Sequence, residues 1–210
     1  MTMVKKKDLE LFLENTPEYS SPKEHLEQYI TPPIIASELL WEAFMHNDIA
    51  DKTILDMGCG TLRLGLGALM LDARRVIGID IDCDVLNNVV KWIDRNKGYK
   101  HKILLICGDA IESQLNNIDT VIMNPPFGVK KHNRGLDVMF LKKALTIAKS
   151  VYSIHKDSPG LYRIVNELLG MVKGRIVYLK KTIYPIKMIL PHHRRRVYWI
   201  NVVLYGVKRE

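Results

Sequence analysis

Residues 53–60 read Thr-Ile-Leu-Asp-Met-Gly-Cys-Gly, a short apolar run that ends in two closely spaced glycines. The first five residues, Thr53–Met57, are typical of a strand that is buried on both faces of a parallel sheet. Gly58 and Gly60 then let the backbone turn tightly and approach a ligand closely where the next helix begins. The stretch therefore predicts a strand, a candidate ligand-binding turn and a helix in succession.

The alternation of strand and helix continues to about residue 155. Three further short apolar runs predict strands: Arg75–Asp80, Ile103–Cys107 and Thr120–Met123. Apolar residues that recur every three or four positions predict helices between and after them: Val85, Leu86, Val89, Val90 and Ile93, and then Val138, Leu141, Leu145, Ala148 and Tyr152. This repeated pattern predicts an α/β fold with a doubly wound, mostly parallel sheet.

The two ends of the chain add to this core. Ser158-Pro159 opens another predicted helix, and Arg175–Ile183 and Val197–Tyr205 read as two strands, joined by a basic loop, that close the sheet as an antiparallel edge. Near the N-terminus, helices are predicted at Lys6–Asn15 and around Ile35–His46. We expect residues 1–50 to form a helical extension packed on a core domain of residues 51–210.

Composition excludes several classes of protein. The 210 residues are 47% hydrophobic and 26% charged, as in ordinary globular proteins. No apolar run reaches the roughly 20 residues that span a bilayer, and the N-terminus lacks the apolar core of a signal peptide, so a cytoplasmic location is expected. Cys59, Cys83 and Cys107 lie far apart without metal-ligand spacing, and we expect reduced thiols and no metal site.

Acidic residues follow the predicted strands at one edge of the sheet. Asp56, Asp80 and Asp109 each stand at or just beyond a strand end, and the carboxyl ends of parallel strands share one crevice. An acid in the position of Asp80 receives ribose hydroxyls in dinucleotide-type folds, and Asp109 can accept a hydrogen bond from the amine of an adenine ring. Asp82 and Asp84 are expected to cap the next helix instead.

This crevice resembles that of the S-adenosylmethionine-dependent methyltransferases, whose first strand commonly ends in Asp-x-Gly-x-Gly. Here the pattern is Asp56-Met57-Gly58-Cys59-Gly60, and Leu62 stands where the family usually has a third glycine. Leucine adopts a positive φ only at a cost, and its side chain is expected to crowd the cofactor. The departure concerns cofactor affinity rather than the fold.

Asn124-Pro125-Pro126-Phe127 directly follows the fourth predicted strand and is the most specific motif in the chain. The prolines fix the backbone and remove N–H donors, which leaves the Asn124 side-chain oxygen and the Pro125 carbonyl to accept both hydrogens of a planar amine. Phe127 offers a face on which a base can stack. Accepting these hydrogens raises the electron density of a poorly nucleophilic aromatic amine, so positioning and electrostatics can supply the rate.

The tetrapeptide marks amino-methyltransferases that act on adenine, cytosine or protein glutamine, and the flanking sequence narrows the resemblance. From about Leu9 to Leu204 the chain resembles the small methyltransferase-like family of archaea and eukaryotes, which methylates the adenine N6 of small-subunit ribosomal RNA. The segments that carry this likeness are Glu27-Gln28-Tyr29 with Thr31 and Pro33, Val121–Gly128, Gly135 with Asp137, Phe140-Leu141 and Val151–Lys156.

The resemblance implies a seven-stranded Rossmann-like sheet, S-adenosyl-L-methionine as cofactor, and roles for individual residues. Asn124, Pro125, Pro126 and Phe127 would be catalytic. The cofactor-binding residues would be Gln28, Thr31, Asp56, Gly58, Gly60, Thr61, Arg63, Asp80 and Asp109, with Arg63 acting through its backbone. Eukaryotic members work with a small zinc-binding activator that covers an apolar edge, and the resemblance makes such a subunit a candidate partner.

Basic residues gather in two segments that can flank the substrate mouth. Lysine and arginine number 31 against 23 acids, a formal net charge of +8 that favours a polyanionic partner such as RNA. The candidate RNA-binding residues, which would neutralise phosphates, are Lys130, Lys131, Arg134, His193, Arg194, Arg195 and Arg196.

The sequence thus predicts a methyltransferase that acts on the N6 amine of an adenine in structured RNA, with small-subunit ribosomal RNA as the leading substrate. Two alternatives stay open. Protein glutamine N5-methylation poses the same planar-amine problem, but those enzymes usually carry tyrosine in the place of Phe127 and have less need of basic loops. A non-catalytic RNA-binding scaffold would fit Leu62 but not the intact Asn124–Phe127.

Overall fold

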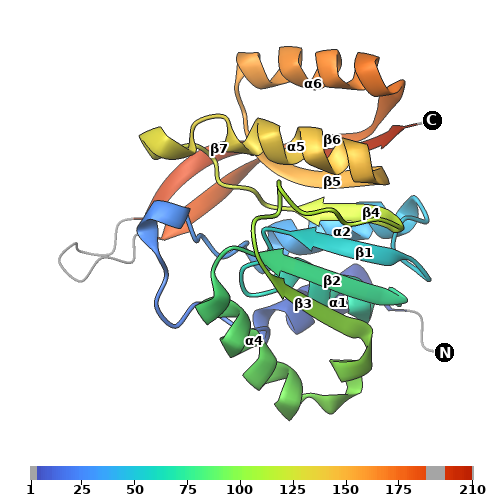
Figure 1. Cartoon of the computed structure of the whole chain (residues 1–210), viewed down its shortest axis with the longest axis vertical. Coiled ribbons are helices and arrows are strands. Elements are labelled where there is room, and N and C mark those ends of the chain that lie inside the picture. Colours follow the sequence, from blue (N-terminus) through green and yellow to red (C-terminus); the bar gives the residue numbers. More distant parts are fainter. Residues whose placement is uncertain (1–3, 188–196, 210) are drawn as a thin grey trace.

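The computed structural model describes residues 4–187 and 197–209, which form a twisted sheet with helices on both faces (Figure 1). The strands are β1 Thr53–Met57, β2 Arg75–Asp80, β3 Ile103–Cys107, β4 Ile118–Met123, β5 Ala148–Lys156, β6 Gly174–Lys187 and β7 Val197–Arg209. The helices are α1 Lys6–Glu14, α2 Pro33–Met45, α3 Arg63–Met70, α4 Cys83–Arg95, α5 Leu136–Ile147 and α6 Pro159–Val172, with short 3-10 helices η1 Glu24–Leu26, η2 Lys97–Lys102 and η3 Lys131–Asn133.

The strands of the described residues form one sheet in the order β3-β2-β1-β4-β5-β7-β6. The first five are parallel, whereas β7 runs antiparallel between β5 and β6. The predicted α/β fold, a doubly wound and mostly parallel seven-stranded sheet with an antiparallel edge, is confirmed. The strand order reverses between β1 and β4, and ligands bind at such a switch point, outside the carboxyl ends of the strands.

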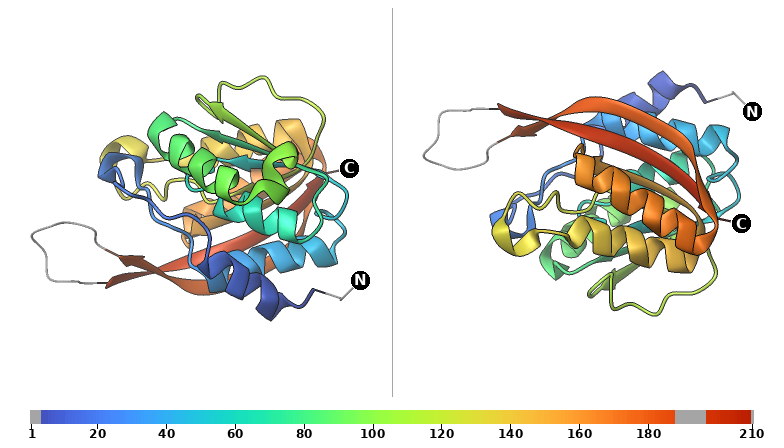
Figure 2. Two further views of the ribbon diagram at one scale, coloured as in Figure 1. Left: turned by 90° about the horizontal axis from the view of Figure 1, so that it is seen from below. Right: turned by 90° about the horizontal axis from the view of Figure 1, so that it is seen from above.

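The sheet separates two apolar cores, because successive strand residues point to opposite faces. Ile54 of β1 belongs to the core beneath α1, α2, α3 and α4, and its neighbour Leu55 belongs to the core beneath α5 and α6 (Figure 2). Helices α1 and α2 share the first core with α3, and a domain division at residue 50 stays a prediction. Within the described residues, no helix has the length and apolarity needed to cross a membrane.

The predicted helix through Tyr152 is wrong at its end. Helix α5 ends at Ile147, and β5 begins at once with Ala148. This strand lies between β4 and β7 and is buried on both faces, so seven of its nine residues are buried, the polar residues Ser150, Ser153 and His155 among them. Such a run has no clear period of its own, and its spacing from Val138 onward imitates a helix.

The expectation of three reduced cysteines is also wrong, because Cys83 and Cys107 form a disulfide. Cys107 ends β3 in register with Asp80, the last residue of β2, and Cys83 begins α4 three residues later. Adjacent strands therefore bring the two Cα atoms to 5.3 Å although 24 residues separate them in the chain. Cys59 is free and buried.

The antiparallel pair of strands β6 and β7 extends beyond the end of β5, the strand next to it. Lys156, the last residue of β5, pairs with Val202, so residues 197–201 of β7 and 183–187 of β6 pair only with each other. This segment, called the hairpin arm below, projects past the carboxyl edge of the parallel strands (Figures 1 and 2). It therefore stands at the same edge of the sheet as the acidic strand ends.

Candidate active site

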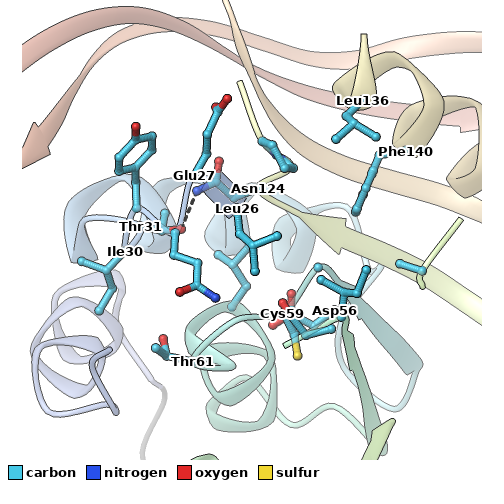
Figure 3. A pocket seen from close by; sticks show the side chains of 18 of the residues that line it. Leu26, Glu27, Ile30, Thr31, Asp56, Cys59, Thr61, Asn124, Leu136 and Phe140 are labelled. Carbon is cyan, nitrogen blue, oxygen red and sulfur yellow. Dashed lines mark hydrogen bonds between the residues drawn. The ribbon is translucent and has the colours of Figure 1, made fainter. Parts of the chain in front are cut away.

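A cavity of about 180 Å³ opens at the carboxyl ends of the parallel strands (Figure 3). It brings together most of the residues singled out in the sequence, namely Gln28, Thr31, Asp56, Gly58, Thr61, Arg63, Asp80, Asp109, Asn124 and Pro126. Gly60, Pro125 and Phe127 do not line it. Asp109 is exposed at the rim, where one carboxylate oxygen accepts from the Ile111 backbone N–H at 2.8 Å.

The turn after β1 has the backbone that its glycines allow. Gly58 and Gly60 have φ angles of +69° and +50°. A Cβ added to Gly60 would lie 2.1 Å from the hydroxyl of Tyr19, which packs over the turn. The Gly60 N–H donates to one oxygen of Asp80 at 2.7 Å, and the Asp82 N–H donates to the other at 2.9 Å. Burial raises the pKa of Asp80, and each of its oxygens keeps a further lone pair for a ligand.

Asp56 stabilises the connection between β1 and α3, which contains this turn. Its carboxylate is almost completely buried and accepts from the Gly65 N–H in the first turn of α3 at 2.8 Å. Burial raises the pKa of this carboxyl well above its ordinary value. Asp56 therefore ties β1 to α3 as well as lining the cavity.

Leu62 does not crowd the cavity, so the sequence expectation for it is wrong. Its φ of +61° turns the side chain away from the cavity into the first core, where it is fully buried. A Cβ added to Gly65 or Gly78 would lie 2.9 or 2.6 Å from the Leu62 side chain. Those two glycines, on α3 and β2, make the space that the leucine fills.

The segment before α2, which includes Gln28 and Thr31, lines the cavity and is held in place by side-chain hydrogen bonds. Gln28 donates to Asp82 at 2.7 Å and accepts from the Lys23 N–H at 2.6 Å. Asp82 caps α4 as predicted, whereas the Asp84 side chain does not, and both carboxylates pair with Lys23. The segment is thus held against the start of α4.

Arg63 fastens the same segment to α3. Its guanidinium is buried and donates to the Thr16 hydroxyl and to the Thr31 carbonyl, each at 2.9 Å. The sequence prediction considered only its backbone. The Arg63 side chain therefore also holds the segment before α2 in place, which the sequence motif does not indicate.

The Asn124 amide has a defined orientation. Its nitrogen donates to the Thr31 hydroxyl at 3.0 Å and to the Tyr184 hydroxyl at 3.1 Å, while the Tyr184 hydrogen goes to the Tyr29 carbonyl at 3.2 Å. Because that hydrogen is engaged elsewhere, Tyr184 can only accept from Asn124. The Asn124 side-chain oxygen is buried and has no hydrogen-bond partner among the described residues. It is a free acceptor at the cavity wall (Figure 3).

The tetrapeptide separates this first cavity from a second one. Phe127 and Gly128 line the second cavity together with Arg134, Gly135, Asp137, Val138, Lys156, Ser158, Gly160, Leu161 and Ile164. Phe127 is only 6% exposed and meets Tyr184 edge-on, with the ring centres 5.2 Å apart. One side of the motif therefore faces the acidic strand ends, and the other faces the starts of α5 and α6.

Sequence reasoning missed the roles of Tyr184 and Glu27. Tyr184 lies on β6, 60 residues after Asn124, and no local pattern links the two. One oxygen of Glu27 accepts from the Lys130 N–H at 2.8 Å and from the Asn133 amide at 3.1 Å, which docks the loop after the tetrapeptide. Its other oxygen is buried and has no partner in the described residues, although the residue itself lines the first cavity. In the sequence, Glu27 stands out only as part of a family motif.

The candidate RNA-binding residues fall into two groups. Arg134 is exposed and lines the second cavity, Lys131 is exposed on η3, and Lys130 is paired with Glu24. His193, Arg194, Arg195 and Arg196 lie outside the described residues.

The chain is similar to known methyltransferases in sequence and in structure. The methyltransferase small domain family matches residues 34–151. The chain is 41% identical over 167 residues to the rRNA N(6)-adenosine-methyltransferase METTL5 of Danio rerio, covering 74% of this chain and 76% of that protein. It is 36% identical over 184 residues to the rRNA N(6)-adenosine-methyltransferase Mettl5 of Drosophila melanogaster, covering 84% of each. A crystal structure from Pyrococcus horikoshii, whose name describes a candidate RNA methyltransferase, is similar with a TM-score of 0.87 and 34% identity over 99% of both chains.

Proposed function

We propose that this chain, which belongs to the methyltransferase small domain family, methylates the exocyclic N6 amine of an adenine in structured RNA, with small-subunit ribosomal RNA as the substrate. The observation that carries the proposal is the side-chain oxygen of Asn124, a residue that lines the first cavity: the oxygen is buried and has no hydrogen-bond partner among the described residues. The two similar rRNA N6-adenosine-methyltransferases support the choice of adenine in RNA. The phenylalanine at position 127 disfavours protein glutamine as the substrate.

The first cavity fits S-adenosyl-L-methionine, whose bound sulfonium supplies an electrophilic methyl group. The second lone pairs of Asp80 can accept ribose hydroxyls, and Asp109 at the rim can accept the adenine amine. The turn at Gly58, with Thr61 and Thr31, would hold the methionine end. Gln28 and Arg63 would act mainly by fastening the segment that covers the cavity.

In the proposed reaction the target base enters from the side of the second cavity, against Phe127. The Asn124 side-chain oxygen and the Pro125 carbonyl then accept the two hydrogens of the N6 amine, which keeps the nitrogen lone pair in line with the methyl group. Thr31 and Tyr184 hold the Asn124 nitrogen, so the oxygen cannot rotate away from the amine. A preorganised acceptor of this kind replaces a strong base.

The direct test is methylation of total RNA with isotopically labelled cofactor, followed by digestion to nucleosides. The label should appear in N6-methyladenosine, and Asn124→Ala should lower turnover by about two or more orders of magnitude. Cofactor affinity, measured by calorimetry, should change far less. Retained turnover in the variant would refute the role of Asn124, and label in protein glutamine would refute the choice of substrate.

Two further expectations belong to this proposal. A zinc-binding activator subunit would fit an enzyme of this family in eukaryotes, and a cytoplasmic location would fit a ribosomal RNA substrate. Both stay predictions.

A further inference from the structure

The hairpin arm presents large apolar side chains to solvent. Trp199 is 67% exposed, Ile183 is 56% exposed and Val197 is 42% exposed. Single exposed apolar residues are normal on a protein surface, but these three stand on two paired strands that project from the molecule (Figures 1 and 2). A tryptophan exposed in such a group indicates a binding surface.

The register of the arm shows which way Trp199 faces. Tyr184, whose side chain points to Asn124, pairs with Ile200, so Trp199 points to the opposite face. Trp199 shares its face with its partner Pro185 and with the Asn201–Ile183 pair. Further along the same face, Val203 lies in the core beneath α5 and α6. Trp199 therefore lies on the α6 side of the sheet.

This face continues into the second cavity. The Asn201 carbonyl accepts from the Asp157 N–H at 2.9 Å, and the neighbours of Asp157, Lys156 and Ser158, line the cavity. Lys156 is exposed, as is Arg134 on the facing loop, and neither forms an ion pair within the described part of the chain. By the same register, Lys156 pairs with Val202 and projects from the face opposite to Trp199. The surface between Phe127 and the arm therefore carries Arg134 and Asp137 where it meets the cavity and an aromatic side chain further out.

We propose that Trp199 stacks on an unpaired base of the RNA next to the nucleotide being methylated. The inference rests on the proposed function. Every base has a π-face that an indole can cover, and Arg134 can neutralise a phosphate between that base and the target. A protein docked on this face would also cover the entrance to the second cavity and exclude the substrate. The position of the arm therefore favours the substrate itself as the occupant.

The test compares RNA affinity in four proteins: the wild type, Trp199→Ala, Trp199→Phe and Met171→Ala. Met171 is 78% exposed near the other end of α6, so its variant controls for the loss of any exposed apolar side chain. The probes are a structured RNA with an adenine-containing single-stranded segment, called the single strand below, and the same RNA with that segment annealed to its complement, called the duplex; binding is measured by fluorescence anisotropy. Methyl transfer to the single strand gives KM and kcat.

We expect Trp199→Ala to weaken binding of the single strand by about five- to tenfold and to raise KM by a similar factor, with kcat unchanged. Trp199→Phe keeps an aromatic face and should stay within about twofold of the wild type. All four proteins should bind the duplex equally. The Met171→Ala variant should bind and methylate the single strand as the wild type does. If Trp199→Ala binds and methylates the single strand as the wild type does, the stacking role is refuted while the proposed function stands. If the wild type neither binds nor methylates RNA, both are refuted.

Discussion

The Asn124 amide is held on its nitrogen side by the hydroxyls of Thr31 and Tyr184, which leaves its oxygen without a hydrogen-bond partner in the described part of the chain. Tyr184→Phe removes one of these acceptors but keeps the buried ring and its edge contact with Phe127. We expect kcat to fall by about tenfold, because the amide can then rotate, and the free energy of unfolding to fall by about 1 kcal/mol.

A matched control exists on the same strand. The Tyr178 hydroxyl donates to Glu38 at 2.9 Å, away from the cavity. Tyr178→Phe should cost similar stability in urea unfolding without lowering kcat. Equal kcat values for the two variants would show that Tyr184 does not position Asn124.

Leu62 gives a second prediction at the residue scale. Replacing it by glycine relieves a positive φ, worth about 1 kcal/mol, but removes a fully buried leucine, worth about 3 kcal/mol with its cavity. Leu62→Gly should therefore destabilise the fold by about 2 kcal/mol in urea unfolding. Cofactor affinity measured by calorimetry should hardly change, because the side chain does not line the cavity. A stabilised variant would mean that backbone strain outweighs the packing.

At the scale of elements, the Cys83–Cys107 disulfide joins the start of α4 to the end of β3, beside the acidic strand ends. It closes a loop across 24 residues, for which the loss of unfolded-state entropy corresponds to about 3 kcal/mol. Cys83→Ser should lower the free energy of unfolding by about that amount when the wild type is oxidised. In a reducing buffer the two proteins should unfold alike, and a difference that persists there would point to packing instead.

At the scale of the whole molecule, the net charge of +8 should govern RNA affinity. The segments 130–134 and 192–196 contribute six lysine and arginine side chains, three from each. If half or more reach phosphates, the log–log dependence of affinity on salt should have a slope between about −2 and −5. Neutralising Arg194, Arg195 and Arg196 together should flatten it and leave cofactor binding intact. An unchanged slope would show that these charges are simply solvated.

The local sequence determined the order and type of most elements, because buried parallel strands and amphipathic helices carry periods that can be read directly. It also determined which strand ends carry Asp56, Asp80, Asp109 and the tetrapeptide, since each of these lies within two residues of the end of its strand. The edge of the sheet then brings them into one cavity. The prediction of a helix through Tyr152 is wrong, because β5 is buried on both faces and its sequence lacks the alternation of apolar and polar residues that marks a strand.

Tertiary structure alone decided the rest. The orientation of the Asn124 amide depends on Thr31 and Tyr184, which precede it by 93 and follow it by 60 residues. The direction of the Leu62 side chain depends on the space at Gly65 and Gly78, and the disulfide depends on the register of β2 and β3. These features arise from contacts between elements far apart in the chain, and a one-dimensional pattern does not record which surfaces the folded core brings together.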